Sequence, residues 1–116
     1  MKVRIHQGTK EIGGTCIELA AGGDRIALDF GLPLDGDAAD SRLVPEIAGD
    51  DLRAIVITHP HIDHYGLLHH LSGKTPVVMG GAARRIVQAA APFTGQPLPP
   101  LDGPELEHGK PIDIGA

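Results

Sequence analysis

Short apolar runs separated by glycine-rich and polar turns make up most of the chain. Such runs, alternating with polar residues or continuously apolar and β-branched, are typical of strands. We therefore expect strands over residues 2–6, 15–20, 25–29, 52–57 and 75–79. The turn residues at 21–24 (Ala-Gly-Gly-Asp) favour a hairpin between the second and third of these strands.

Helical patterns lie mainly in the second half of the chain. We expect a short helix over residues 65–71 and a longer one over residues 82–91, the latter closed by Pro92. A helical turn is expected over residues 43–47, and residues 106–114 are typical of the start of a hairpin. Strands with flanking helices place the chain in the α/β (α+β) class, with a mixed β-sheet.

Length and charge limit the size of the domain and the kinds of partner that the chain can bind. With 116 residues the chain can form one small domain over 1–116, and its net charge of −5 provides no basic surface for nucleic acid. Bound divalent cations would add positive charge locally, so RNA stays open as a substrate. The single cysteine, Cys16, excludes an intrachain disulfide. Without a signal peptide or a membrane-length apolar segment, we expect a cytoplasmic protein with no membrane association.

The strongest chemical signal follows the apolar run at residues 54–57. Three histidines and an aspartate lie within six residues: His59, His61, Asp63 and His64. Side chains alternate along extended chain, so His59 and His61 point the same way and can hold one metal ion. Asp63 and His64 follow a turn of the chain and can face a second ion about 4 Å away, an arrangement that activates water for hydrolysis.

Imidazole and carboxylate groups suit zinc best, with manganese or iron as alternatives. Other histidines in the chain are weaker candidates. His69 and His70 lie close behind the motif, where we expect surface or supporting positions, and His108 lies in a turn. Arg84 could contact a phosphate, although a solvated helix face is the simpler expectation.

The pattern His-x-His-x-Asp-His after an apolar strand resembles the metal motif of the metallo-β-lactamase superfamily. Residues 11–19 and 26–31 resemble the opening of its ribonuclease J and β-CASP-like branch. The resemblance implies the amino-terminal half of an αββα sandwich. It implies that Asp29, at the end of a strand, supports the site by bonding a ligand histidine. It also implies that a second half of the domain would supply three further metal ligands: a third histidine, a bridging aspartate and a final histidine. The segment 112–115 resembles the strand that precedes the third histidine in the family.

The function implied is metal-dependent hydrolysis with two zinc ions, in which Asp63 is also catalytic because it orients the attacking water. The ribonuclease J-like opening favours phosphodiester hydrolysis in RNA. Hydrolysis of a small ester, thioester or lactone is the alternative, and a catalytically incomplete metal-binding fragment is the second alternative. Half a sandwich would leave one apolar sheet face uncovered, so we also expect marginal stability or self-association through that face.

Overall fold

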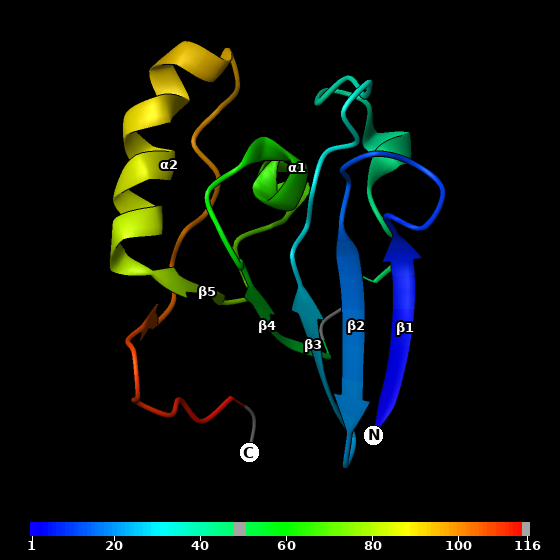
Figure 1. Cartoon of the computed structure of the whole chain (residues 1–116), viewed down its shortest axis with the longest axis vertical. Helices are drawn as coiled ribbons and strands as arrows, with labels where there is room; N and C mark the ends of the chain where they lie inside the picture. Colours follow the sequence, from blue (N-terminus) through cyan, green and yellow to red (C-terminus); the bar gives the residue numbers. More distant parts are fainter. Residues whose placement is uncertain (48–50, 115–116) are drawn as a thin grey trace.

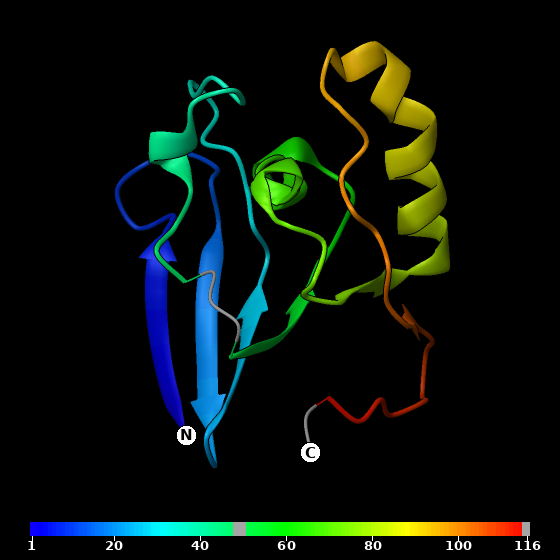
Figure 2. The same cartoon turned by 180° about the vertical axis from the view of Figure 1, so that it is seen from behind.

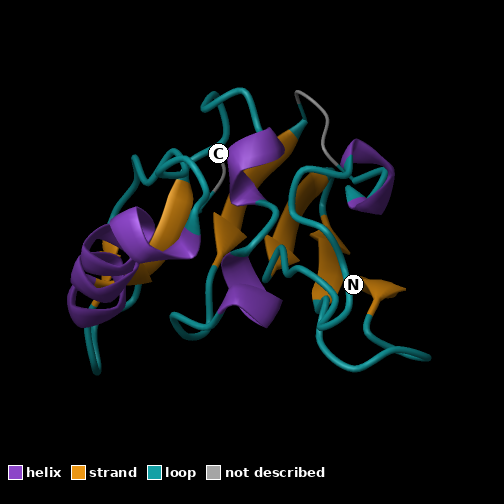
Figure 3. Ribbon diagram, turned by 90° about the horizontal axis from the view of Figure 1, so that it is seen from above, coloured by secondary structure: helices purple, strands orange, loops and turns teal. Residues whose placement is uncertain are grey.

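The computed structural model describes residues 1–47 and 51–114, and in them six strands form one mixed sheet (Figure 1). In sheet order the strands are β1 (Lys2–Gln7), β2 (Cys16–Ala21), β3 (Asp24–Leu28), β4 (Leu52–Val56), β5 (Val77–Gly80) and β6 (Glu105–Leu106). Strands β1 to β3 pair antiparallel, and β3 to β6 pair parallel. Seen from above, the strands lie side by side in one curved layer (Figure 3). The mixed α/β class and the β2–β3 hairpin are therefore confirmed.

The longest helix, α2 (Gly81–Thr94), follows β5 and lies at that end of the sheet, far from β1 (Figures 1 and 2). The prediction that Pro92 closes it is wrong, because Pro92 lies inside the last turn. The helix ends instead at Gly95, whose left-handed φ of 68° is a conformation that glycine adopts without strain. Among the described residues, no helix combines the length and hydropathy needed to cross a bilayer.

The predicted helix over residues 65–71 starts earlier and is interrupted. It forms as α1 (Ile62–Tyr65) and a separate 3₁₀ turn, η2 (Leu68–His70). The interruption is caused by a residue distant in the sequence: the Leu67 amide donates to the carbonyl of Phe30 at 3.0 Å. The turn expected over residues 43–47 is also displaced. It forms as η1 (Ser41–Leu43), where the Asp40 side chain accepts the Arg42 amide as a cap.

The predicted hairpin over residues 106–114 is wrong within the described residues. Only the short strand β6 forms, and it pairs parallel with β5, while residues 107–114 form no strand. The guanidinium of Arg84 explains this path, because it donates to the carbonyls of Leu101, Gly103 and Pro104 and so holds the segment beside β5. Arg84 is therefore a structural anchor rather than a solvated residue. Gly115, part of the segment compared above with a family strand, lies outside the described residues.

The two faces of the sheet differ in how they are covered. The core lies on one face, under the helices and loops, and includes Cys16, Ala27, Phe30, Ile55, Leu67, Val77, Met79 and Val87, each no more than 1% exposed. The other face carries a second set of apolar side chains in register across β1 to β5: Val3, Ile5, Ile17, Leu19, Ile26, Leu28, Ala54, Val56 and Val78. The covering is uneven: Ala54 and Val78 are each 1% exposed, whereas Val3 and Ile5, on β1, are 59% and 53% exposed. An apolar face of this kind needs a covering layer or stays in contact with water.

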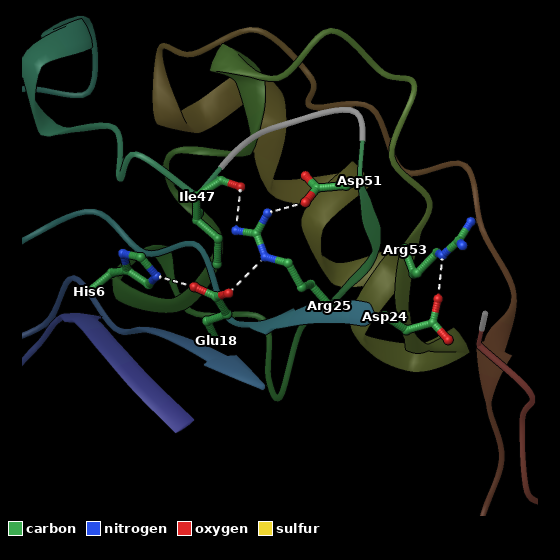
Figure 4. A network of polar contacts seen from close by, with 7 residues as sticks. All are labelled: His6, Glu18, Asp24, Arg25, Ile47, Asp51 and Arg53. Carbon is green, nitrogen blue, oxygen red and sulfur yellow. Dashed lines mark hydrogen bonds and ion pairs between the residues drawn. The ribbon is translucent and has the colours of Figure 1, made fainter. Parts of the chain in front are cut away.

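A network of ion pairs joins β1, β2 and β3 (Figure 4). The buried Glu18 carboxylate binds His6 and Arg25, each at 2.7 Å, and Arg25 continues to Asp51 at 2.6 Å. Hydrogen bonds from Arg25 and then His6 lower the pKa of Glu18 to about 2. The network thus ties the antiparallel strands to the start of β4 without involving the metal motif.

Candidate metal centre

The candidate site lies where the parallel strands β3 and β4 end. Leu28 and Val56 are paired, so Asp29, the next residue after Leu28, and Thr58, two residues after Val56, meet at the same edge of the sheet. The Asp29 amide donates to the Val56 carbonyl at 2.8 Å, which extends the pairing by one residue. The motif histidines then occupy the loop and short helix beyond β4, a position where a rigid sheet supports a binding loop.

Helix α1 is held against two loops by backbone hydrogen bonds. Three of its carbonyls accept amides from the segments around residues 15 and 30. These bonds join Leu32 to Ile62 (3.1 Å), Thr15 to Asp63 (3.2 Å) and Phe30 to His64 (2.8 Å). Glycines make the close approach possible. A Cβ on Gly31 would lie 1.7 Å from the Asp63 carbonyl oxygen, and one on Gly13 would lie 2.9 Å from the Asp63 Cβ.

The structure brings the predicted ligands together. The rings of His59 and His64 have centroids 3.8 Å apart, and those of His59 and His61 are 4.8 Å apart. The Asp63 Oδ2 atom lies 3.4 Å from the His64 Nε2 atom. His61 is exposed, whereas His59, Asp63 and His64 are half-buried. The cluster is thus open to solvent on one side and supported by protein on the other.

Asp29 is buried at 3% exposure and accepts three hydrogen bonds. Its Oδ1 atom accepts the Thr58 amide at 2.8 Å, and its Oδ2 atom lies 2.9 Å from the Thr58 hydroxyl and 2.7 Å from His64 Nδ1. Asp29 also has a left-handed φ of 62°, an uncommon conformation that aspartate tolerates better than most residues. Strained backbone of this kind concentrates at functional sites.

Sequence reasoning missed Thr58, whose hydroxyl also lies 3.0 Å from His59 Nδ1. The sequence did indicate a role for Thr58, because a hydroxyl residue directly precedes the first histidine of the motif. As a result, the Nδ1 atoms of both His59 and His64 have hydrogen-bond partners. The Nε2 atoms are the nitrogens left for a metal ion.

The other candidate residues lie in different surroundings. His69 and His70 both direct Nε2 to the Ala38 carbonyl, at 2.9 and 2.7 Å, and so brace the loop that follows β3. His108 is exposed, as expected. Cys16 is fully buried, and burial, followed by the charges of Asp29 and Glu18, raises its pKa to about 12. A thiol in that state does not supply the thiolate that a metal needs.

The ligand set is incomplete as it stands. Within residues 1–47 and 51–114, no group of three His, Cys, Asp or Glu side chains is arranged to hold a metal ion by itself. The residue types nevertheless fit zinc, since imidazole nitrogens and a carboxylate meet at one edge of the sheet. These residues therefore have the chemistry of a zinc site but not, among the described residues, the arrangement of a complete one.

Comparison with known proteins identifies the family. The sequence profile described as Metallo-beta-lactamase superfamily matches residues 11–114. The chain belongs to the metallo-β-lactamase superfamily. A subclass B3 metallo-β-lactamase, MEM-A1, from a soil metagenome library has the same fold over 89% of this chain and 43% of that one, with a TM-score of 0.58 and 18% identity. At this identity the likeness concerns the fold alone.

Two sequence relatives of this superfamily member carry informative names. The transcription termination factor FttA of Methanothermobacter thermautotrophicus is 40% identical over 68 residues, which cover 55% of this chain and 11% of that protein. An RNase J-like protein of Methanocaldococcus jannaschii is 27% identical over 66 residues, covering 57% of this chain and 14% of that protein. The predicted resemblance to ribonuclease J-like proteins is thus confirmed. The chain spans a small part of these relatives' lengths.

Proposed function

We propose that this chain carries half of a two-zinc centre in a hydrolase that cleaves phosphodiester bonds in RNA. The observation that carries the proposal is the state of the motif histidines. Nδ1 of His59 and of His64 is engaged by the protein, which leaves Nε2 of each ring as the nitrogen for a metal ion, and Nε2 of His64 lies 3.4 Å from the Asp63 carboxylate. Supporting hydrogen bonds of this kind orient metal-binding histidines and fix their tautomers.

The ligands divide between two ions. His59 and His61 hold one ion, and Asp63 and His64 hold the other, with manganese or iron as possible substitutes for zinc. The remaining ligands come from outside these 116 residues. The incomplete ligand set among the described residues supports this, as does the 43% share that the chain covers of a related structure. Bound metal supplies Lewis-acid activation of water and of the phosphoryl group.

Residues of this chain position the attacking water and the metal-binding side chains. Asp63 is the catalytic residue: its carboxylate orients the attacking water and accepts a hydrogen bond from it. Asp29 holds the His64 ring in place, and the backbone bonds to α1 fix where Asp63 stands. A site held this way loses little entropy when it binds its ligands.

RNA is the proposed substrate because of the relatives. One is named an RNase J-like protein and another a transcription termination factor, and both align with the half of this chain that contains the motif. The net charge of −5 does not oppose this, since bound dications supply positive charge where a phosphate binds. A single buried cysteine is compatible with a reducing, cytoplasmic location, which we include in the proposal.

The test is an assay of the natural full-length polypeptide containing these residues, with zinc or manganese, on RNA and on ester, thioester and lactone substrates. We expect RNA cleavage that falls at least 100-fold in His61→Ala, with His108→Ala as the matched control. Cleavage unchanged in His61→Ala would refute the proposal. Ester or lactone turnover without RNA cleavage would overturn the substrate, and metal binding without any turnover would overturn the enzyme.

A further inference from the structure

The Thr58 side chain lies between the Asp29 carboxylate and the first histidine of the motif. Its hydroxyl oxygen is 2.9 Å from Asp29 Oδ2 and 3.0 Å from His59 Nδ1. Its backbone amide donates to the other oxygen of the same carboxylate at 2.8 Å. Thr58 is exposed, and Asp29 holds it at two points, the backbone amide and the hydroxyl.

The protons in this chain of contacts can be assigned by counting donors. A threonine hydroxyl has one hydrogen, and a carboxylate that accepts three hydrogen bonds has none to give. The hydroxyl hydrogen must therefore go to Asp29. The hydroxyl oxygen is then an acceptor toward His59, so Nδ1 of His59 carries the hydrogen and Nε2 carries the lone pair.

The same carboxylate sets the second ring. Asp29 Oδ2 lies 2.7 Å from Nδ1 of His64 and accepts its hydrogen. One buried group thus dictates the same tautomer in two histidines, directly for His64 and through the Thr58 hydroxyl for His59. The centroids of the two rings are 3.8 Å apart, and in each ring Nε2 is then the nitrogen with the lone pair.

We propose that Thr58 is a positioning residue that relays the acceptor character of Asp29 to His59 and holds this ring in its Nδ1–H tautomer. The tautomer assignment stands on the contacts alone. Its consequence, a metal affinity raised by the preset Nε2 lone pair, rests on the proposed function. Without the hydroxyl, His59 must reorient and shift its proton before it can bind a metal.

Two substitutions isolate the hydroxyl. Thr58→Val keeps the shape and β-branching of the side chain and the amide bond to Asp29, but removes the hydroxyl. Thr58→Ser keeps the hydroxyl and is the matched control. Because His64 bonds Asp29 directly, its tautomer is an internal reference that should be the same in all three proteins.

The measurement is the imidazole nitrogen signals of the metal-free, ¹⁵N-labelled chain at about pH 8, above the ordinary pKa of imidazole. We expect His59 to be Nδ1–H in the wild type and in Thr58→Ser, and to move toward Nε2–H in Thr58→Val. Zinc affinity, measured in parallel by competition with a chelator, should fall about 10-fold in Thr58→Val and recover in Thr58→Ser.

The inference is overturned if His59 has the same tautomer in Thr58→Val as in the wild type, or if Thr58→Ser behaves like Thr58→Val. A His59→Ala variant separates the two levels. Zinc binding that is unchanged in His59→Ala contradicts the proposed function. Zinc binding that is lost in His59→Ala but equal in Thr58→Val and the wild type contradicts the proposed role of Thr58.

Discussion

Gly31 is the position where one added methyl group should most disturb the site. A Cβ at residue 31 would lie 1.7 Å from the carbonyl oxygen and 2.4 Å from the carbonyl carbon of Asp63. Both are backbone atoms, so no side chain can rotate away to relieve the clash. The loop at residue 31 and helix α1 must separate by more than about 1 Å, and Asp63 moves with the helix.

The cost of this separation follows from what it breaks. Overpacking at a tight position costs about 1–3 kcal/mol. The separation also weakens the two bonds that join this loop to α1, from Phe30 to the His64 carbonyl (2.8 Å) and from Leu32 to the Ile62 carbonyl (3.1 Å). Each is worth about 1 kcal/mol. We therefore expect Gly31→Ala to lower the free energy of unfolding by about 3–5 kcal/mol, a large share of the 5–15 kcal/mol typical of a domain.

The assay is urea unfolding followed by circular dichroism, with Gly22→Ala as the matched control. Gly22 has a left-handed φ of 60° and no neighbour within 4 Å of its added Cβ, so its substitution costs only backbone strain, about 1–2 kcal/mol. This reasoning would be refuted if Gly31→Ala lowered the free energy of unfolding no more than Gly22→Ala does, with the same dependence of that free energy on urea concentration. It would show that α1 is not pressed against the loop.

Three further outcomes are expected. Asp29→Asn, which keeps the left-handed backbone accessible but places an amide beside His64 Nδ1, should weaken zinc binding roughly 10- to 100-fold in chelator competition. Glu18 has a lowered pKa of about 2, so its stabilising contribution is complete above the ordinary glutamate pKa and is lost as the pH falls from about 4.5 toward 2; Glu18→Gln should flatten the unfolding free energy in that window. Concentration-dependent sedimentation should reveal self-association through the sheet face that carries the exposed Val3 and Ile5, and Ile5→Lys should reduce it.

Two of these expectations have a control variant within the chain, and each has an outcome that would contradict it. Zinc binding unchanged in Asp29→Asn would contradict the supporting role of this carboxylate. Asp35→Asn changes an exposed carboxylate, and acid sensitivity equal to that of Glu18→Gln would contradict the ion-pair argument. Ile86 on α2 is 51% exposed, close to the 53% of Ile5, so Ile86→Lys separates the effect of the face from that of surface hydrophobicity. A monomer with a concentration-independent unfolding transition would refute self-association.

The sequence was most informative where local pattern and tertiary structure agree. Strands β1 to β5 were predictable because their apolar runs are short, rich in β-branched residues and bounded by turns. Asp29 was predictable as a site residue only through family resemblance, since an aspartate before Phe-Gly is otherwise an ordinary turn residue. Its contacts with Thr58 and His64 depend on two strands meeting in parallel, which no local pattern shows.

The errors arose where long-range contacts decide local structure. The helix after the motif breaks because Leu67 bonds to Phe30, a residue far away in the sequence. The predicted hairpin is absent because Arg84 binds carbonyls of the segment that would have led into it. The carboxyl-terminal end of helix α2 was predicted wrongly for a local reason. Pro92 can occupy the last turn of a helix, and Gly95 is the residue at which this helix ends.

The central claim is that the His59–His64 motif holds metal. The most direct test is elemental analysis of the purified full-length polypeptide after zinc loading and size-exclusion chromatography, with His59→Ala, Asp63→Ala and the control His108→Ala alongside. We expect zinc in the wild type and in His108→Ala, and a marked loss in both motif variants. Equal zinc content in all four proteins would contradict the account, because the metal would then bind somewhere other than this motif.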